Sequence, residues 1–172
     1  TESAVGAAEI IARNGGPRAC AAIVGYADLT LGEQLAAVIE DHLSAGTGRF
    51  RGVRHSVARD EHFPDGIVLR PAPPGLLLES SYRDGLRVAH RFGLSYDAMI
   101  YHAQLRELTA LADWMPDLPI VLDHMGCILG VGPYRGRSTE TFQSWRADIR
   151  ELARRANVSV KLGGLGMIIC GA

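Results

Sequence analysis

Short apolar runs and helix-length amphipathic segments alternate along almost the whole chain. The apolar runs predict five strands, at residues 19–26, 50–57, 94–101, 119–124 and 158–162. Apolar residues at i, i+3 and i+4 predict the helices that alternate with them, at residues 1–14, 31–45, 82–92, 104–114 and 139–156. Regular alternation of this kind produces right-handed crossovers and a parallel sheet with helices outside it. The sequence therefore predicts an α/β fold.

Glycine and proline mark where several of these segments end. Gly15-Gly16-Pro17 is a typical stop for the first helix, and Gly93 for the third. Ser81 with Asp84 resembles a capping box at the start of the third helix. Residues 58–79 are charged and proline-rich and are expected to form a long surface loop, a lid over the strand ends. Residues 125–137 are expected to form a glycine-rich loop.

Composition narrows the class of protein. The chain has 172 residues, 47% of them apolar, and a formal net charge of -1. That charge balance argues against a nucleic-acid partner, and no apolar run approaches the roughly 20 residues of a membrane span. Three scattered cysteines indicate reduced thiols in a reducing compartment. We therefore expect a cytoplasmic protein that binds neither nucleic acid nor membrane.

Two histidines follow the last apolar residues of neighbouring predicted strands. His102 follows Ile100-Tyr101, and His124 ends the run Ile120-Val121-Leu122-Asp123. Because neighbouring strands lie about 4.8 Å apart, both imidazoles are expected to reach one ligand. Neutral imidazole binds zinc and similar ions, and two histidines make half of a tetrahedral site. An equally good interpretation is that each ring bonds to backbone or to a nearby carboxylate, because two histidines alone are not a metal motif.

Arg54 and His55 lie at the end of the second predicted strand. Consecutive strand residues face opposite ways, so only one of the two side chains is expected to point toward a site. An inward arginine would bind a substrate carboxylate through two parallel hydrogen bonds. The alternative pairs Arg54 with a structural acid such as Asp28 or Asp97.

Three further polar positions have competing interpretations. Tyr101 is a weaker candidate, because a tyrosine at a strand end is often part of the core. Asp123 could orient a metal ligand or cap the following segment, and Lys161 is expected to form an internal ion pair. Gly163-Gly164-Leu165-Gly166 follows a strand, as barrel phosphate sites do, but it also fits a tight turn.

Five segments together resemble one known family. They are Gly25-Tyr26-Ala27-Asp28-Leu29, Phe50-Arg51-Gly52-Val53-Arg54-His55, Tyr101-His102-Ala103-Gln104-Leu105, Val121-Leu122-Asp123-His124-Met125-Gly126 and Val160-Lys161-Leu162-Gly163-Gly164-Leu165-Gly166. The chain resembles the amidohydrolase-related family, in the branch of dicarboxylate and sugar lactonases and some decarboxylases. The Asp-His-Met-Gly and Gly-Val-Arg-His pieces are the most specific.

The resemblance implies a (β/α)8 TIM barrel in the parent protein. The five predicted strands would be its third to seventh, so residues 1–172 would form a single incomplete barrel domain with about five of the eight strand–helix units. The chain begins at Thr1 without a methionine, and the apolar run Met167-Ile168-Ile169-Cys170 stands two residues before its end. We therefore expect it to be the middle of a larger protein.

The resemblance also implies roles for the candidate residues. His102 and His124 match the family's histidines that end the fifth and sixth strands and bind metal or polarise the substrate carbonyl. Arg54 matches an arginine that binds a carboxylate, and Tyr101 and His55 would contact the same substrate. The family's His-x-His pair on the first strand and its aspartate on the eighth have no counterpart in this sequence, and Cys127 stands where a glycine is usual.

The resemblance also implies a function, that of a hydrolase. Its small-molecule substrate would be a lactone or a similar carbonyl compound that carries a carboxylate. A divalent metal, zinc first, or the family's aspartate would activate water, and a metal-free mechanism is also open. This chain alone is expected to have little or no activity. One alternative is a zinc-dependent decarboxylase of the same branch. The other is an inert barrel fragment that associates with itself through its open edges.

Overall fold

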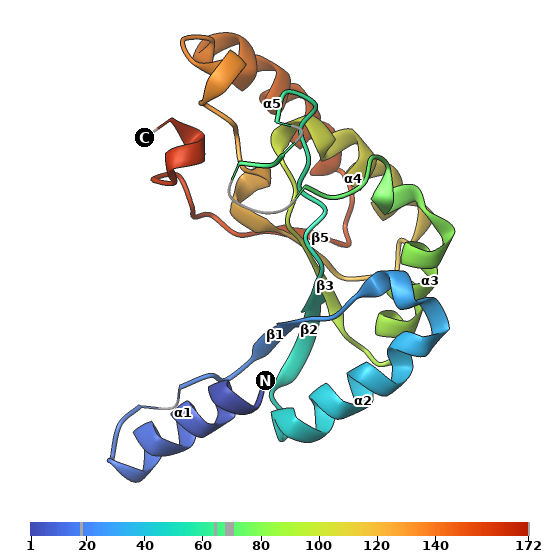
Figure 1. Cartoon of the computed structure of the whole chain (residues 1–172), viewed down its shortest axis with the longest axis vertical. Helices are drawn as coiled ribbons and strands as arrows, with labels where there is room; N and C mark the ends of the chain where they lie inside the picture. The colour runs from blue at the N-terminus through green and yellow to red at the C-terminus, as the bar shows by residue number, and fades with distance from the viewer. Residues whose placement is uncertain (18, 64, 68–70, 172) are drawn as a thin grey trace. The chain divides into compact units, whose positions relative to one another are not determined.

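The computed structural model confirms the alternation of helices and strands that the sequence predicts. It describes residues 1–17, 19–63, 65–67 and 71–171. The elements, in chain order, are α1 (Glu2–Arg13), β1 (Ile23–Tyr26), α2 (Leu35–Gly46), β2 (Phe50–Arg54), α3 (Ser80–Arg91), β3 (Ser95–Ala98), α4 (Leu105–Trp114), β4 (Ile120–Leu122), α5 (Ser138–Leu152) and β5 (Val158–Val160). The strands follow the order β1-β2-β3-β4-β5 in one sheet, and β1 with β2 and β4 with β5 pair in parallel. Figure 1 shows these elements.

The strands are shorter than the apolar runs predict. The first begins only at Ile23, and the second ends at Arg54, before residues 55–57. β3 ends at Ala98 and β4 at Leu122, so neither His102 nor His124 belongs to a strand. His102 begins a short 3-10 segment after β3, His102–Gln104, and His124 lies in a turn after β4, Asp123–Gly126, whose backbone angles are not those of a regular helix. Backbone turns that follow a strand continue the apolar pattern, which is why the sequence pattern alone overextends the strands.

The helices start and end close to their predicted positions, with two differences. The segment predicted as a helix over 31–45 begins as a 3-10 segment, Leu29–Gln34, before α2. The third helix begins at Ser80, ahead of the predicted Ser81–Asp84 capping box, and Asp84 accepts a hydrogen bond from Arg87. Part of the predicted loop at 58–79, residues 64 and 68–70, lies outside the described residues.

The chain divides into two compact units. The first contains residues 1–55 and 80–96, and the second contains residues 56–79 and 97–172. In the first unit, α3 packs closely on the 3-10 segment Leu29–Gln34. A Cβ at Gly85 would lie 2.1 Å from the carbonyl oxygen of Leu29, so this close approach requires glycine. The core of this unit is built from Leu29, Leu35, Ile39, Phe50, Val53, Tyr82 and Leu86.

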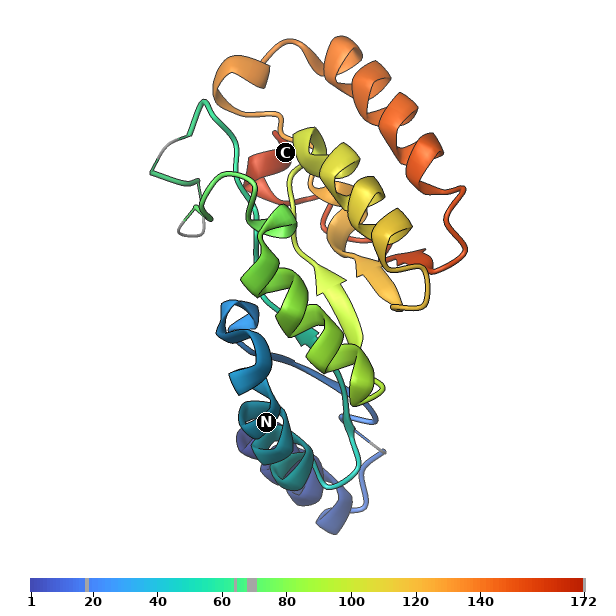
Figure 2. The same ribbon diagram turned by 90° about the vertical axis from the view of Figure 1, so that its right-hand side faces the viewer.

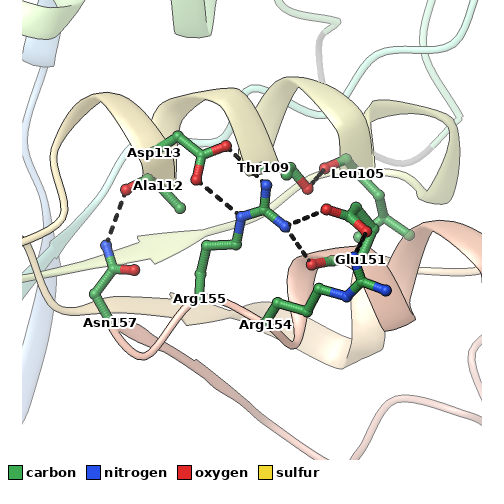
Figure 3. A network of polar contacts seen from close by, with 8 residues as sticks. All are labelled: Leu105, Thr109, Ala112, Asp113, Glu151, Arg154, Arg155 and Asn157. Carbon is green, nitrogen blue, oxygen red and sulfur yellow. Dashed lines mark hydrogen bonds and ion pairs between the residues drawn. The ribbon is translucent and has the colours of Figure 1, made fainter.

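In the second unit, α4 and α5 lie side by side (Figure 2). Arg155 joins them, donating from Nε and Nη2 to the Asp113 carboxylate at 2.9 and 2.8 Å and from Nη1 to Glu151 (Figure 3). The Asn157 amide donates to the carbonyl oxygens of Met115 and Leu118 at the end of α4. The core beneath these helices includes Leu105, Leu108, Leu111, Ile120, Leu122 and Leu152.

Two predictions from composition can be compared with the structure. All three cysteines are free thiols, as expected. Among the described residues, no helix combines the length and the apolar character needed to cross a membrane.

Candidate functional site

The two candidate histidines lie in neighbouring turns of the second unit. The 3-10 segment that begins at His102 contacts the segment that contains His124. The segments after β3 and β4 therefore bring the two residues into one region. Their joint binding of one ligand stays a prediction.

His102 is held in a defined orientation. Its side chain is buried, its Nδ1 accepts a hydrogen bond from the backbone N–H of Leu129 at 3.3 Å, and its ring packs edge-on against Tyr134. Burial lowers the pKa of His102 below its usual value, and nearby acids such as Asp60 only partly oppose this effect. A neutral ring whose Nδ1 accepts a hydrogen bond carries its proton on Nε2. His102 is therefore a hydrogen-bond donor at Nε2.

His124 lies in a turn with a rare backbone conformation. His124, Met125, Gly126 and Cys127 all have positive φ angles, of 51°, 55°, 78° and 42°. The left-handed region costs a residue other than glycine roughly 1–2 kcal/mol, and it is normally visited by single residues. Three of these four residues carry a Cβ, so the turn is strained and must be held by its surroundings.

Contacts from three other segments surround this turn. The indole Nε1–H of Trp145, in α5, donates to the Met125 carbonyl oxygen at 2.8 Å. Gly126 packs against Leu105 at the start of α4, and Gly164, after β5, lies against the His124 ring. Asp123, the residue before His124, is completely buried and accepts a hydrogen bond from Lys161 Nζ at 2.9 Å.

Lys161 joins the ends of three consecutive strands. Its Nζ contacts both Asp97, in β3, and Asp123, directly after β4, and both carboxylates are buried. Burial lowers the pKa of Lys161, but its two acidic partners outweigh that effect and raise the pKa above its usual value. The predicted internal ion pair of Lys161 is thus confirmed, and Asp123 is one of its partners.

A cavity of about 470 Å³ opens beside His124. Its wall is mainly apolar, with Leu129 and Phe142 among the side chains that line it, and hydroxyl groups of residues at the start of α5 contribute polar atoms. Among the described residues that line it there is no Asp, Glu, Lys or Arg, and the ionisable ones are His124 and Cys170. The cavity therefore fits a neutral part of a ligand, next to an imidazole.

The Nδ1 atom of His124 is a candidate metal ligand. It is buried and has no hydrogen-bond partner among the described residues, so in the tautomer that leaves it unprotonated it offers a lone pair to a cation. His102 differs, because its Nδ1 already accepts from Leu129. Within the described residues, no group of three or more His, Cys, Asp or Glu side chains could hold a metal ion. His124 thus fits the role of one metal ligand, without a complete set around it.

The substrate-binding candidates of the first unit lie at the end of β2. His55 accepts a hydrogen bond from the backbone N–H of Leu29 at Nδ1, and Asp28 lies 3.5 Å from the same atom. Burial lowers the pKa of His55, and Asp28 opposes this effect. Arg54 is half-buried beside it. Asp28 therefore lies close to the His55 ring without a hydrogen bond to it, and the substrate roles of Arg54 and His55 stay predictions.

Tyr101 belongs to an apolar cluster of the second unit. It is 2% exposed and packs with Ala58, Cys127, Leu129 and Ile169. Burial raises the pKa of its hydroxyl. This placement matches the core interpretation, and contact of Tyr101 with a substrate stays a prediction.

Two polar groups near His102 were not singled out as site candidates. The buried Gln104 side chain accepts from the backbone N–H of Arg59 and donates to the Val57 carbonyl, which fixes the loop after residue 55 to the His102 turn. Asp60, also buried, accepts from the Tyr134 hydroxyl at 2.6 Å. Gln104 also accepts from the backbone N–H of Tyr101, and Asp60 from that of His62, but the contacts that connect them to other segments join residues 45 to 74 positions apart, which local sequence does not indicate.

Comparison with known proteins gives relatives over most of the chain. A protein of Sinorhizobium fredii named "Uncharacterized protein y4mH" is 33% identical over 84% of this chain and 44% of its own length. An L-fucono-1,5-lactonase of Burkholderia ambifaria is 32% identical over 84% of this chain and 43% of its own length. The chain thus spans less than half the length of these curated relatives.

Solved structures agree in fold. An amidohydrolase of Burkholderia multivorans, crystallised with bound zinc, matches with a TM-score of 0.67 at 24% identity, over 94% of this chain and 49% of that one. Its structure in another crystal form, with bound HEPES, matches with a TM-score of 0.64. These are TIM barrels of which this chain covers about half, which confirms the predicted partial barrel. The model of the family described as Amidohydrolase matches residues 7–168, and the chain belongs to that family.

Proposed function

We propose that this protein is a hydrolase of the lactonase type, which opens a lactone or a similar carbonyl compound carrying a carboxylate. The observation that carries the proposal is the pair of imidazoles, His102 and His124, in contacting turns after two successive strands of an amidohydrolase fold. The relative named L-fucono-1,5-lactonase supports the choice of a lactone.

His102 would act on the carbonyl oxygen. Its Nε2–H donates, and a fixed donor stabilises the negative charge that develops on that oxygen when water attacks the carbonyl carbon. The bond between the carbonyl carbon and the ring oxygen then breaks. The proton lost by the attacking water balances the one gained by the departing ring oxygen, and a hydroxy acid results.

His124 would face the same carbonyl group from the cavity. Its unpartnered Nδ1 is the atom that would hold a zinc ion, a metal present in the Burkholderia multivorans structure. Such a metal, when bound, supplies Lewis-acid polarisation of a carbonyl or a bound water. The apolar cavity wall would exclude bulk water around the uncharged part of the substrate.

Acid release from L-fucono-1,5-lactone, which has no carboxylate, from a sugar lactone that carries one and from a lactone without sugar hydroxyls tests the proposal. The chain alone is expected to have little or no activity, so the assay uses a protein in which the remaining strands of the barrel complete this chain. The expected result there is hydrolysis of the lactone that carries a carboxylate above the spontaneous rate, lowered at least about tenfold in H102Q or H124Q, which removes an imidazole that contacts the reacting group. Turnover that is equal in the two variants and the wild type would contradict the proposal. Release of carbon dioxide from an unsaturated or aromatic acid, without lactone hydrolysis, would favour a decarboxylase.

A further inference from the structure

We infer that Trp145 is a positioning residue for His124. Its indole N–H holds the strained turn of residues 124–127 in the conformation that presents the imidazole to the cavity. The catalytic meaning of this inference rests on the proposed function, but its geometric content does not.

The turn does not have an intrinsic preference for its conformation. Four successive residues have positive φ angles, and only Gly126 among them adopts such angles without a steric penalty. Inside the turn, the Cys127 N–H donates to the His124 carbonyl oxygen at 2.9 Å, a contact that closes the turn without relieving the strain at His124 and Met125. The free energy that offsets the strain of the turn must therefore come from contacts with other elements.

Trp145 supplies such a contact at the middle of the turn. Its Nε1–H donates to the Met125 carbonyl oxygen at 2.8 Å. The ring is half-buried, and it packs on Phe142 of the same helix with ring centroids 5.4 Å apart. The donor thus belongs to a 15-residue helix that packs on α4, so it can oppose relaxation of the turn.

Relaxation of the turn would move the His124 ring. The ring is fitted against Gly164, and both residues line the cavity together with Met125 and Phe142. A change of φ at Met125 moves the peptide groups on both sides of it, and the His124 side chain is attached to one of them. The direction and surroundings of Nδ1 would then change, although His124 itself is unaltered.

The test compares W145F with W114F in the full chain. Both variants replace a helical tryptophan by phenylalanine, but only W145F removes the N–H that reaches Met125. We expect W145F to shift or broaden the ¹⁵N and ¹H signals of the His124 imidazole, and W114F to leave them unchanged. Replacing Trp145 by 3-benzothienylalanine, which keeps the ring shape but lacks the N–H, should reproduce the W145F change if W145F does not fold.

Rescue distinguishes positioning from simple packing. Glycine adopts a positive φ readily, so Met125→Gly in the W145F background should return the His124 signals toward their wild-type positions. Lactone hydrolysis is measured in parallel in the protein completed by the remaining barrel strands, where kcat/KM is expected to fall about five- to tenfold in W145F, the effect of losing one ordinary hydrogen bond. A His124 signal that stays unchanged in both Trp145 variants would overturn the inference. A shifted signal in a protein without lactone turnover would leave the inference intact and count against the proposed function alone.

Discussion

Gly164 and the His124 imidazole are in such close contact that a side chain at position 164 would overlap the ring. A Cβ on Gly164 would lie 2.8 Å from Nδ1 and 2.9 Å from Cγ of His124, and the φ angle of Gly164 is +78°. From the sequence, the glycine-rich segment after β5 fits either a phosphate site or a tight turn. In the structure, one of its residues, Gly164, packs against the His124 ring.

Substituting Gly164 by alanine should therefore displace His124. Overlap with the ring and an unfavourable φ act together, so we expect G164A to lower the free energy of unfolding by about 1–3 kcal/mol and to shift the His124 imidazole signals. Gly163 is the matched control, because a Cβ there meets no atom within 4 Å. Denaturant unfolding and imidazole NMR check the prediction, and equal behaviour of G163A and G164A would contradict it.

Removing the Lys161 ammonium should leave two buried carboxylates without their shared cation. Asp97 and Asp123 are 1% and 0% exposed, whereas Lys161 is 42% exposed, so solvent screens the pair on one side. We expect K161M to lower the free energy of unfolding by roughly 2–4 kcal/mol, below the full cost of breaking a completely buried pair. Adding D123N, which removes one carboxylate charge, should recover part of the loss. Unfolding curves of K161M and D123N/K161M that coincide would count against this account.

Asn157 should stabilise the end of α4. Its Nδ2 lies 3.1 Å from the Met115 carbonyl oxygen and 3.2 Å from that of Leu118, and it also reaches Ala112 (Figure 3). N157A removes this donor and should cost about 1–2 kcal/mol in thermal or denaturant unfolding. N157D should cost more, since it turns an anionic oxygen toward carbonyl oxygens. The account fails here if N157D is as stable as the wild type.

The buried His102 should make stability depend on pH. Its folded-state pKa lies below the ordinary value of 6.5, so the unfolded chain binds a proton more readily than the folded one. The stability that the buried, neutral His102 ring contributes is fully present above pH 6.5. It is lost as the pH falls through 6.5 toward the lower pKa of the folded state. His55 has a shift of the same sign and acts in the same direction. We expect the free energy of unfolding to fall between pH 7 and pH 5, and to fall less in H102Q. If the free energy of unfolding depends on pH as steeply in H102Q as in the wild type, the lowered pKa of His102 is contradicted.

Local patterns predicted the elements of this fold because helices and buried strands carry periodic apolar signals. The acidic partner of Lys161 was also predictable, since a lone lysine that follows an apolar strand segment is well placed for an ion pair with a neighbouring acid. The turn at His124 was not, because three of its four residues have side chains that disfavour positive φ angles. In the sequence, Trp145 is simply one of the apolar residues of an amphipathic helix. Its hydrogen-bond partner Met125 lies 20 positions earlier and accepts through its backbone, so its residue type does not indicate the contact. The contact of His102 with Leu129 likewise depends on how a loop closes over the strand ends.

The central proposal is that His102 and His124 act on one ligand, and an NMR titration of the ¹⁵N-labelled chain with L-fuconate, the stable hydrolysis product of L-fucono-1,5-lactone, tests it most directly. Both imidazoles should shift together and saturate with the same dissociation constant, and a shared constant is what two rings around a single bound molecule require. The proposal is contradicted if neither ring responds, or if the two respond with clearly different constants.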